Sequence, residues 1–254
     1  MSNDSLRRTT PITEGTPVTI VPTGNLRRIK SVTLVDNSTP PAVYLEATTT
    51  AWADGINYAV PAGGLTYGDA VTVSGNVTLT LTEGTTLTLN KGISLASGAT
   101  LTVEGTGTMA VNGTNESTAS TVAGSGTLVM TSGTLNAKGG NGQSLTLNDM
   151  TPAHNTGASG GVAINGNVTV SGGTVTATGG NGGNLNTSAA GGDLVMDNRG
   201  GNGGAAISGS VTVNAGGWTA TNGSNGTYTS TPGDHDCSAG TGGAAVAGTV
   251  TDNR

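Results

Sequence analysis

The sequence predicts an all-β fold, a right-handed parallel β-solenoid (β-helix) with a small N-terminal β cap. Three observations predict it: an internal repeat, an alternation of small apolar residues with Thr, and a shortage of bulky side chains. Gly accounts for 45 of the 254 residues, aromatic residues for only 2%, and Phe is absent. Such a chain can fill only a narrow core of Val, Ile, Leu and Ala, which is the core that a solenoid has.

The internal repeat is clearest in the segments 126–142 and 166–182, which align position by position and both end in Gly-Gly-Asn-Gly. A second motif begins at Gly161 and recurs at Gly204 and Gly243, so the later repeats have nearly the same length. Each long repeat carries a pair of strands and an inserted loop, and these loops are expected at about 143–160, 183–203 and 224–242. Because the loops follow the same corner of each repeat, they should emerge on one side of a stacked solenoid.

The N-terminal part of the chain, up to position 66, differs from the rest. Residues 1–15 are polar and are expected to form a flexible arm. Residues 16–66 hold most of the prolines and are read as a β cap or anchor module, with strands expected at 17–21, 29–35 and 42–46. A distinct first element is needed because an open solenoid end exposes unpaired backbone and apolar core.

Residues 67–254 are assigned to the solenoid repeats. Short strands are expected at 71–73, 77–81, 86–89, 93–95, 100–103 and 108–111, with Gly-containing corners between them that supply positive φ angles. The apolar residues of these strands should face inward, while the Thr residues between them face solvent. The expected inward positions are Val71, Val73, Val77, Leu79, Leu81, Leu87, Leu89, Ile93, Leu95, Leu101, Val103, Met109 and Val111.

Composition excludes several classes of partner. The net charge of −6 and the pI of about 4.6 argue against nucleic acid, because phosphate binding needs a basic surface. No run of apolar residues is long enough to insert into a membrane, and the first residues do not form a signal peptide. The single cysteine, Cys237, cannot form an intrachain disulfide.

Residues from Trp52 onward carry a family resemblance. The motifs are Trp-Ala-Asp-Gly-Ile-Asn-Tyr at 52–58, Val-Thr-Val-Ser-Gly-Asn-Val-Thr-Leu at 71–79, and the tandem alternation at 168–180. They resemble a Gly/Thr-rich β-helical repeat family of surface proteins from gut bacteria of the Firmicutes type. The resemblance implies an adhesin-like or carbohydrate-binding role, although the export signal and the cell-wall sorting tail of such proteins are missing here. A phage-borne member of the family would need neither.

Polar residues in the inserted loops are the first candidates for a binding site. Asp234, His235 and Asp236 form the densest polar cluster, and Asp193 with Asp197, Asn198 and Arg199 repeat the theme in the preceding loop. A metal site needs three or four ligands in suitable geometry, and the calcium-binding nonapeptide Gly-Gly-x-Gly-x-Asp is absent. We therefore expect no cofactor and no metal; a Ca²⁺ ion between stacked loops stays open as an alternative.

Two aromatic residues are candidates for sugar binding. Trp218 takes the place of an aliphatic residue of the preceding repeat, and Tyr228 follows shortly after it in the chain. Trp218 is either a core filler near the last coils or an exposed platform on which a sugar ring stacks, with Tyr228 beside it. The acids of residues 61–140 are scattered near Gly corners, so the chain is not expected to be an enzyme.

The sequence thus favours a non-enzymatic extracellular attachment module, a rigid solenoid that displays loops to a host-cell surface or a polysaccharide. One alternative is a phage virion component, such as a tail fibre or a capsid decoration or head fibre protein, anchored by residues 1–60. Through the same residues we expect a homo-oligomer or a larger assembly, on the bacterial surface or on a phage particle. A second alternative is a polysaccharide-active β-helix enzyme, whose turnover would depend on Asp234 or Asp236.

Overall fold

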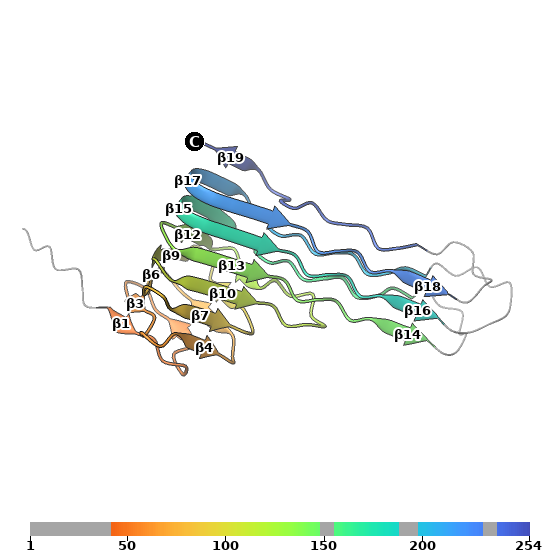
Figure 1. Cartoon of the computed structure of the whole chain (residues 1–254), viewed down its shortest axis with the longest axis horizontal. Coiled ribbons are helices and arrows are strands. Elements are labelled where there is room, and N and C mark those ends of the chain that lie inside the picture. The colour runs from red at the N-terminus through yellow and green to blue at the C-terminus, as the bar shows by residue number, and fades with distance from the viewer. Residues whose placement is uncertain (1–41, 148–154, 188–197, 231–237) are drawn as a thin grey trace, which may run out of the picture. The chain divides into compact units, whose positions relative to one another are not determined.

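The computed structural model describes residues 42–147, 155–187, 198–230 and 238–254, all of which belong to one unit (Figure 1). Nineteen strands and no helix occur among these residues, which confirms the predicted all-β class. All the strand pairings are parallel, as in a β-solenoid. No helix of the described residues could therefore span a membrane.

Sixteen of the strands form three ladders, which the chain visits in turn. Ladder I consists of β2 (Ala51–Trp52), β5 (Val71–Val73), β8 (Ile93–Leu95) and β11 (Val122–Gly124), and is continued by single bridges through Ile164, Ile207 and Val246. Ladder II consists of β1 (Val43–Tyr44), β3 (Asn57–Ala59), β6 (Asn76–Leu81), β9 (Thr100–Gly105), β12 (Thr127–Met130), the first halves of β15 (Asn167–Thr178) and β17 (Val211–Thr221), and β19 (Val250–Asp252). Ladder III consists of β4 (Leu65–Tyr67), β7 (Thr86–Leu89), β10 (Thr108–Asn112), β13 (Thr134–Lys138) and the second halves of β15 and β17.

One passage through the three ladders makes a coil, and successive coils stack in register. Val71 pairs with Ile93 in ladder I, and Leu128 pairs with Val168 in ladder II. The stretch of chain between such partners is therefore nearly twice as long in the later coils as in the early ones. Because adjacent strands of a sheet lie about 4.8 Å apart, each coil adds about that height to the stack, whatever its length.

The core lies between the ladders and is filled by the alternating apolar residues. All thirteen positions that the sequence predicts to face inward are at most 2% exposed, so this prediction is confirmed. Each such side chain stabilises the fold by about 1.5–3 kcal/mol. The next three coils continue the core with smaller residues, among them Ala163, Val170 and Ala206.

Wider side chains fill the first coils. The indole of Trp52 lies 5.8 Å from the ring of Tyr58 and 6.3 Å from that of Tyr67, measured between ring centroids. The indole N–H of Trp52 donates to the carbonyl of Thr49 at 3.1 Å, whereas the Tyr67 hydroxyl has no partner among the described residues, and burial raises its pKa. Strands β1 to β4 already belong to the three ladders; the boundary expected between residues 66 and 67 stays a prediction.

Glycines turn the chain at the corners of the coils. The five corner glycines expected from the sequence all have positive φ, and they are Gly75, Gly84, Gly92, Gly98 and Gly105. At Gly105 (φ 96°) a Cβ would also lie 2.1 Å from the carbonyl oxygen of Leu81, so no other residue fits there. The pair of strands expected in each long repeat is seen in the two halves of β15, which pair with β12 in ladder II and with β13 in ladder III. Strand β15 runs unbroken from ladder II to ladder III, because Gly172 and Gly173 carry it round the corner with a shift in register.

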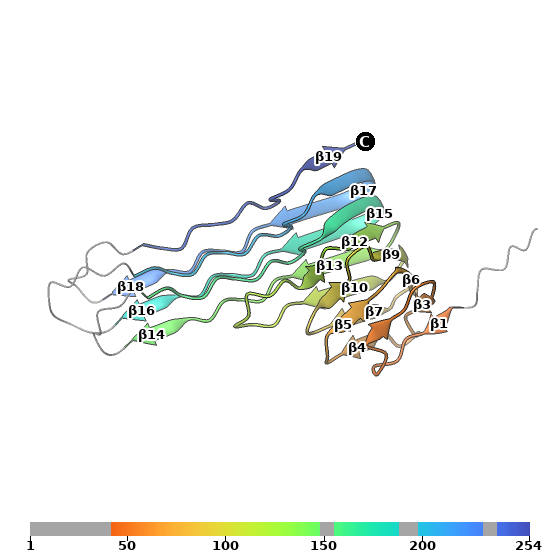
Figure 2. The ribbon, with the colours of Figure 1, turned by 180° about the vertical axis from the view of Figure 1, so that it is seen from behind.

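In the last coils the chain leaves ladder III, travels away from the core and returns to ladder I. The outgoing segments are 139–147, 179–187 and 222–230, and the returning segments are 155–163, 198–206 and 238–246; together we call them the glycine-rich projection. Its outgoing segments end in a three-stranded parallel sheet of β14 (Leu145–Leu147), β16 (Leu185–Thr187) and β18 (Tyr228–Ser230). Figures 1 and 2 show all these segments on one side of the ladders, where the shared spacing of the repeats places them.

Candidate functional site: the glycine-rich projection and its distal end

Most of the hydrogen bonds that join the outgoing and returning layers of the projection are made between backbone groups. Near the ladders they form a zigzag that passes from layer to layer and from coil to coil. In each bond the N–H of one Gly donates to the carbonyl oxygen of another, at 2.8–2.9 Å. The pairs, donor first, are Gly161 and Gly140, Gly180 and Gly161, Gly204 and Gly180, and Gly223 and Gly204.

A second zigzag lies three residues farther out. Its pairs, donor first, are Ala158 and Gln143, Gly183 and Ala158, Gly201 and Gly183, Gly226 and Gly201, and Gly240 and Gly226, at 2.8–3.1 Å. A spacing of three residues is the period of the polyproline II helix, which has no internal hydrogen bonds and leaves its backbone groups for neighbours. The projection is therefore a two-layer stack of extended segments with a period of three residues, joined mainly through their backbones.

Only glycine allows the two layers to approach so closely. A Cβ on Gly179 would lie 1.9 Å from the carbonyl oxygen of Gly204, and one on Gly160 would lie 2.0 Å from that of Gly180. Both distances are far below the 3.0 Å that real Cβ atoms keep. The Gly pairs in the sequence are thus required by packing, as the Gly at every third position of collagen is.

Asn side chains satisfy the N–H groups that cannot reach the other layer. Oδ1 of Asn141 accepts from the backbone N–H of Asn181 at 3.0 Å, and Oδ1 of Asn181 accepts from that of Ser224 at 2.9 Å. The same arrangement recurs nearer the tip, where Oδ1 of Asn184 accepts from the N–H of Thr227 at 2.9 Å. Each Asn thereby caps the equivalent residue of the next coil. These two roles explain the motif Gly-Gly-Asn-Gly: its Gly residues allow the close packing inside the projection, and its Asn lies at the edge, where the side chain accepts a hydrogen bond from the next coil.

The distal end of the outgoing layer has an apolar row and a polar row. In the apolar row Leu185 is fully buried between its register partners Leu145 and Tyr228. The Tyr228 hydroxyl lies 3.0 Å from the hydroxyl of Thr187, within hydrogen-bonding distance. The polar row faces solvent and consists of Thr146, Asn186 and Thr229.

Two predicted site residues, Asn198 and Arg199, lie at the distal end of the returning layer. Asn198 is 1% exposed, and its Oδ1 accepts from the backbone N–H of Asn155 at 3.2 Å. Arg199 is exposed, and its backbone bridges Thr156 on one side and Ser238 on the other. Asn198 thus holds neighbouring segments together, while the Arg199 side chain is turned to the surface.

The remaining predicted site residues are divided between two places. Asp193, Asp197, Asp234, His235 and Asp236 lie outside the described residues, as does Cys237. Trp218 lies in β17 within ladder III, where it pairs with Val175 and packs, half-buried, against the core. The structure therefore keeps Trp218 on the ladders, in a different sheet from Tyr228 at the far end of the projection (Figure 1).

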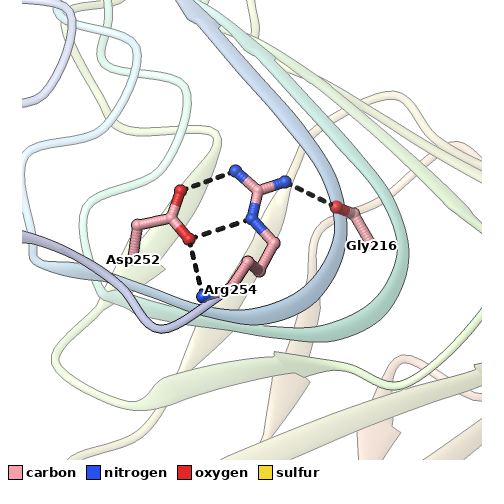
Figure 3. A network of polar contacts seen from close by, with 3 residues as sticks. All are labelled: Gly216, Asp252 and Arg254. Carbon is pink, nitrogen blue, oxygen red and sulfur yellow. Dashed lines mark hydrogen bonds and ion pairs between the residues drawn. The ribbon is translucent and has the colours of Figure 1, made fainter.

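Two ion pairs of the described residues lie at the surface. Lys91 and Asp69 make an exposed ion pair of 2.9 Å. At the C-terminus, Nε of Arg254 donates to Asp252 at 2.9 Å, and a second guanidinium nitrogen donates to the carbonyl of Gly216 at 2.9 Å (Figure 3). Hydrogen bonds from Arg254 lower the pKa of Asp252 to about 2.

No group of three or more His, Cys, Asp and Glu side chains occurs among residues 42–147, 155–187, 198–230 and 238–254. A surface cavity of about 460 Å³ lies between residues 62–66 and 84–88, and its lining is mainly Gly and Thr. The described residues therefore offer hydroxyl, amide and guanidinium groups on a stiff support.

The projection itself was missed by the sequence analysis, which treated its segments as inserted loops. The signal that could have found it is the spacing of glycines by three residues, in 139 and 142, 180 and 183, 201 and 204, and 223 and 226. Comparison with known protein families, with curated proteins and with solved structures found no match.

Proposed function

We propose that the protein is a non-enzymatic extracellular attachment module. Its coils form a right-handed β-solenoid that serves as a rigid body, and the glycine-rich projection presents its distal end to a host-cell surface or a polysaccharide. One observation carries the proposal: the sequence of the projection repeats where its layers pack, and stops repeating where β14, β16 and β18 end.

The packed segments of the projection repeat in sequence, whereas the segments that connect its two layers do not. Gly-Gly-Asn-Gly occurs at 139–142 and 179–182, and Gly-Gly-Asn-Gly-Gly at 200–204. The segments that connect the outgoing to the returning layer read Asn-Asp-Met-Thr-Pro-Ala-His at 148–154, Ser-Ala-Ala-Gly-Gly-Asp-Leu-Val-Met-Asp at 188–197, and Thr-Pro-Gly-Asp-His-Asp-Cys at 231–237. A scaffold repeats because every copy meets the same packing demand, whereas recognition uses different side chains at different points.

The construction of the projection supports binding at its end. Backbone hydrogen bonds order its segments before a ligand arrives, so less conformational entropy is lost on binding. The exposed row of Thr146, Asn186 and Thr229 supplies hydroxyl and amide groups that can both donate to and accept from sugar hydroxyls. Arg199 adds an exposed cation for an acidic sugar.

The test replaces residues 148–154, 188–197 and 231–237, singly and together, with Gly-Ser linkers of equal length. Binding is measured on an array of bacterial and host polysaccharides and on whole cells, and folding is checked by circular dichroism. The triple replacement should abolish binding and leave the strand spectrum unchanged. Binding that survives it would show that the distal end is not the contact surface.

A matched pair of triple variants examines the described residues. Replacing Thr146, Asn186 and Thr229 by Ala should weaken binding, because these residues form the exposed row at the distal end. Replacing Thr66, Thr88 and Thr176 by Ala alters a comparable row on ladder III and should leave binding intact. The opposite result would move the contact surface to the ladders.

A further inference from the structure

Asn-Gly pairs are the places where a polypeptide deamidates most readily. The backbone nitrogen of the Gly attacks the side-chain carbonyl carbon of the Asn, a C–N bond forms and ammonia leaves, which gives a cyclic succinimide. Water then opens the ring at either carbonyl and leaves aspartate or isoaspartate. The chain has seven such pairs, beginning at Asn112, Asn141, Asn165, Asn181, Asn202, Asn222 and Asn225, and the structure describes all of them.

In six of the pairs the attacking nitrogen is held by a hydrogen bond. The N–H groups of Gly113, Gly142, Gly182, Gly223 and Gly226 donate to backbone carbonyls of neighbouring segments at 2.7–2.9 Å. The N–H of Gly203 donates to Oδ1 of Asn225 at 3.2 Å. A nitrogen held in this way points away from the Asn side chain before it, and the stack must open locally before the ring can close.

The pair Asn165 and Gly166 differs from the other six. It lies at the corner between Ile164 of ladder I and β15 of ladder II, and the N–H of Gly166 makes no hydrogen bond to any described residue. The Asn165 side chain is exposed, so water reaches it. Cyclisation here requires no hydrogen bond of the attacking nitrogen to break first.

A neighbouring hydroxyl also activates the Asn165 side chain. Oγ of Ser208, in the next coil, donates to Oδ1 of Asn165 at 2.6 Å. Negative charge develops on this oxygen when the nitrogen attacks, and a donor already aimed at it stabilises that charge. Nδ2 of Asn165 donates to the carbonyl of Gly124 at 3.5 Å, which is a long contact that leaves the amide nitrogen free to depart.

We propose that Asn165 is the site of spontaneous deamidation in the folded protein, with Gly166 as the nucleophile and Ser208 as the positioning residue. The stacked coils protect the other six pairs. The reaction needs only water as co-reactant. Its products add one negative charge at the corner and, in isoaspartate, lengthen the backbone between ladders I and II.

The experiment incubates the full chain at mildly alkaline pH and body temperature. Samples are digested with pepsin at acidic pH, where new succinimide formation is slow, and each pair is followed by mass spectrometry. Asn165 should convert at least about tenfold faster than any other pair, since breaking one backbone hydrogen bond costs roughly a factor of ten in rate. In concentrated urea all seven should convert at similar rates.

Two variants complete the test. N165Q should abolish the fast reaction in the folded protein, and S208A should slow it several-fold without changing the rates in urea. The proposal is overturned if another of the seven pairs converts as fast as Asn165 in the folded chain. An unchanged rate of deamidation at Asn165 in S208A would show that Ser208 does not assist the reaction.

Discussion

Substitution of Gly180 by Ala tests the backbone-only interior of the projection. The new Cβ would lie 1.8 Å from the carbonyl oxygen of Gly140, in the neighbouring coil of the same layer, so the two coils must separate locally until the two atoms are at least 3.0 Å apart. That movement disturbs two hydrogen bonds, one donated by Gly180 to Gly161 and one accepted by Gly180 from Gly204. Overpacking costs about 1–3 kcal/mol and each lost hydrogen bond about 0.5–1.5 kcal/mol. We therefore expect G180A to lower the free energy of unfolding by about 2–6 kcal/mol.

The matched control is G242A, in the returning layer of the last coil. A Cβ there would meet its nearest atom, Oδ1 of Asn225, at the ordinary distance of 3.4 Å. Both substitutions restrict the unfolded chain equally, an effect that alone stabilises by about 0.4–1 kcal/mol. Urea denaturation followed by circular dichroism measures both variants. If G180A is as stable as G242A, the close approach of the stacked glycine backbones is not what the fold requires.

Three further predictions concern the core, the Asn caps and the C-terminus. L101A should lose about 2–5 kcal/mol in urea denaturation, because Leu101 is fully buried and its removal leaves a cavity. N181A should lose about 1 kcal/mol by the same assay, since it removes the acceptor of a backbone N–H in the next coil, whereas N186A, at an exposed position of β16, should lose less than about 0.5 kcal/mol. The carboxyl of Asp252 should titrate near pH 2 by NMR, and R254A should return its pKa towards 3.8. Because the folded pKa is the lower one, this contact is complete above about pH 4 and is lost as the pH falls towards 2.

Alternation of apolar residues with Thr was sufficient to predict the ladders. Val71, Leu87 and Leu101 have one inward side and one outward side in any extended strand, so the pattern reports their burial without knowledge of the rest of the chain. Predicted strands such as 86–89 and 93–95 match β7 and β8, and the Gly corners match because positive φ is a local demand.

The projection could not be predicted in the same way, because its stabilising contacts are made by backbone atoms. The hydrogen bond between the carbonyl of Gly140 and the N–H of Gly161 uses backbone groups, which nearly every residue has. In the sequence, only the glycines, which lack a Cβ atom, indicate that two segments touch. The same Gly content is also typical of flexible linkers, so composition alone does not separate the two. For the candidate site, sequence left Trp218 open between a core filler and an exposed platform, because its half-buried position against the core depends on neighbouring coils.

Native-state hydrogen exchange, measured residue by residue, tests the central claim most directly. If backbone hydrogen bonds form the interior of the projection, the amides of Gly161, Gly180, Gly183, Gly201 and Gly204 should exchange about as slowly as those of the buried strands β9 and β12. Exchange of these glycine amides at the rate of an unfolded chain, with β9 and β12 still protected, would contradict the account.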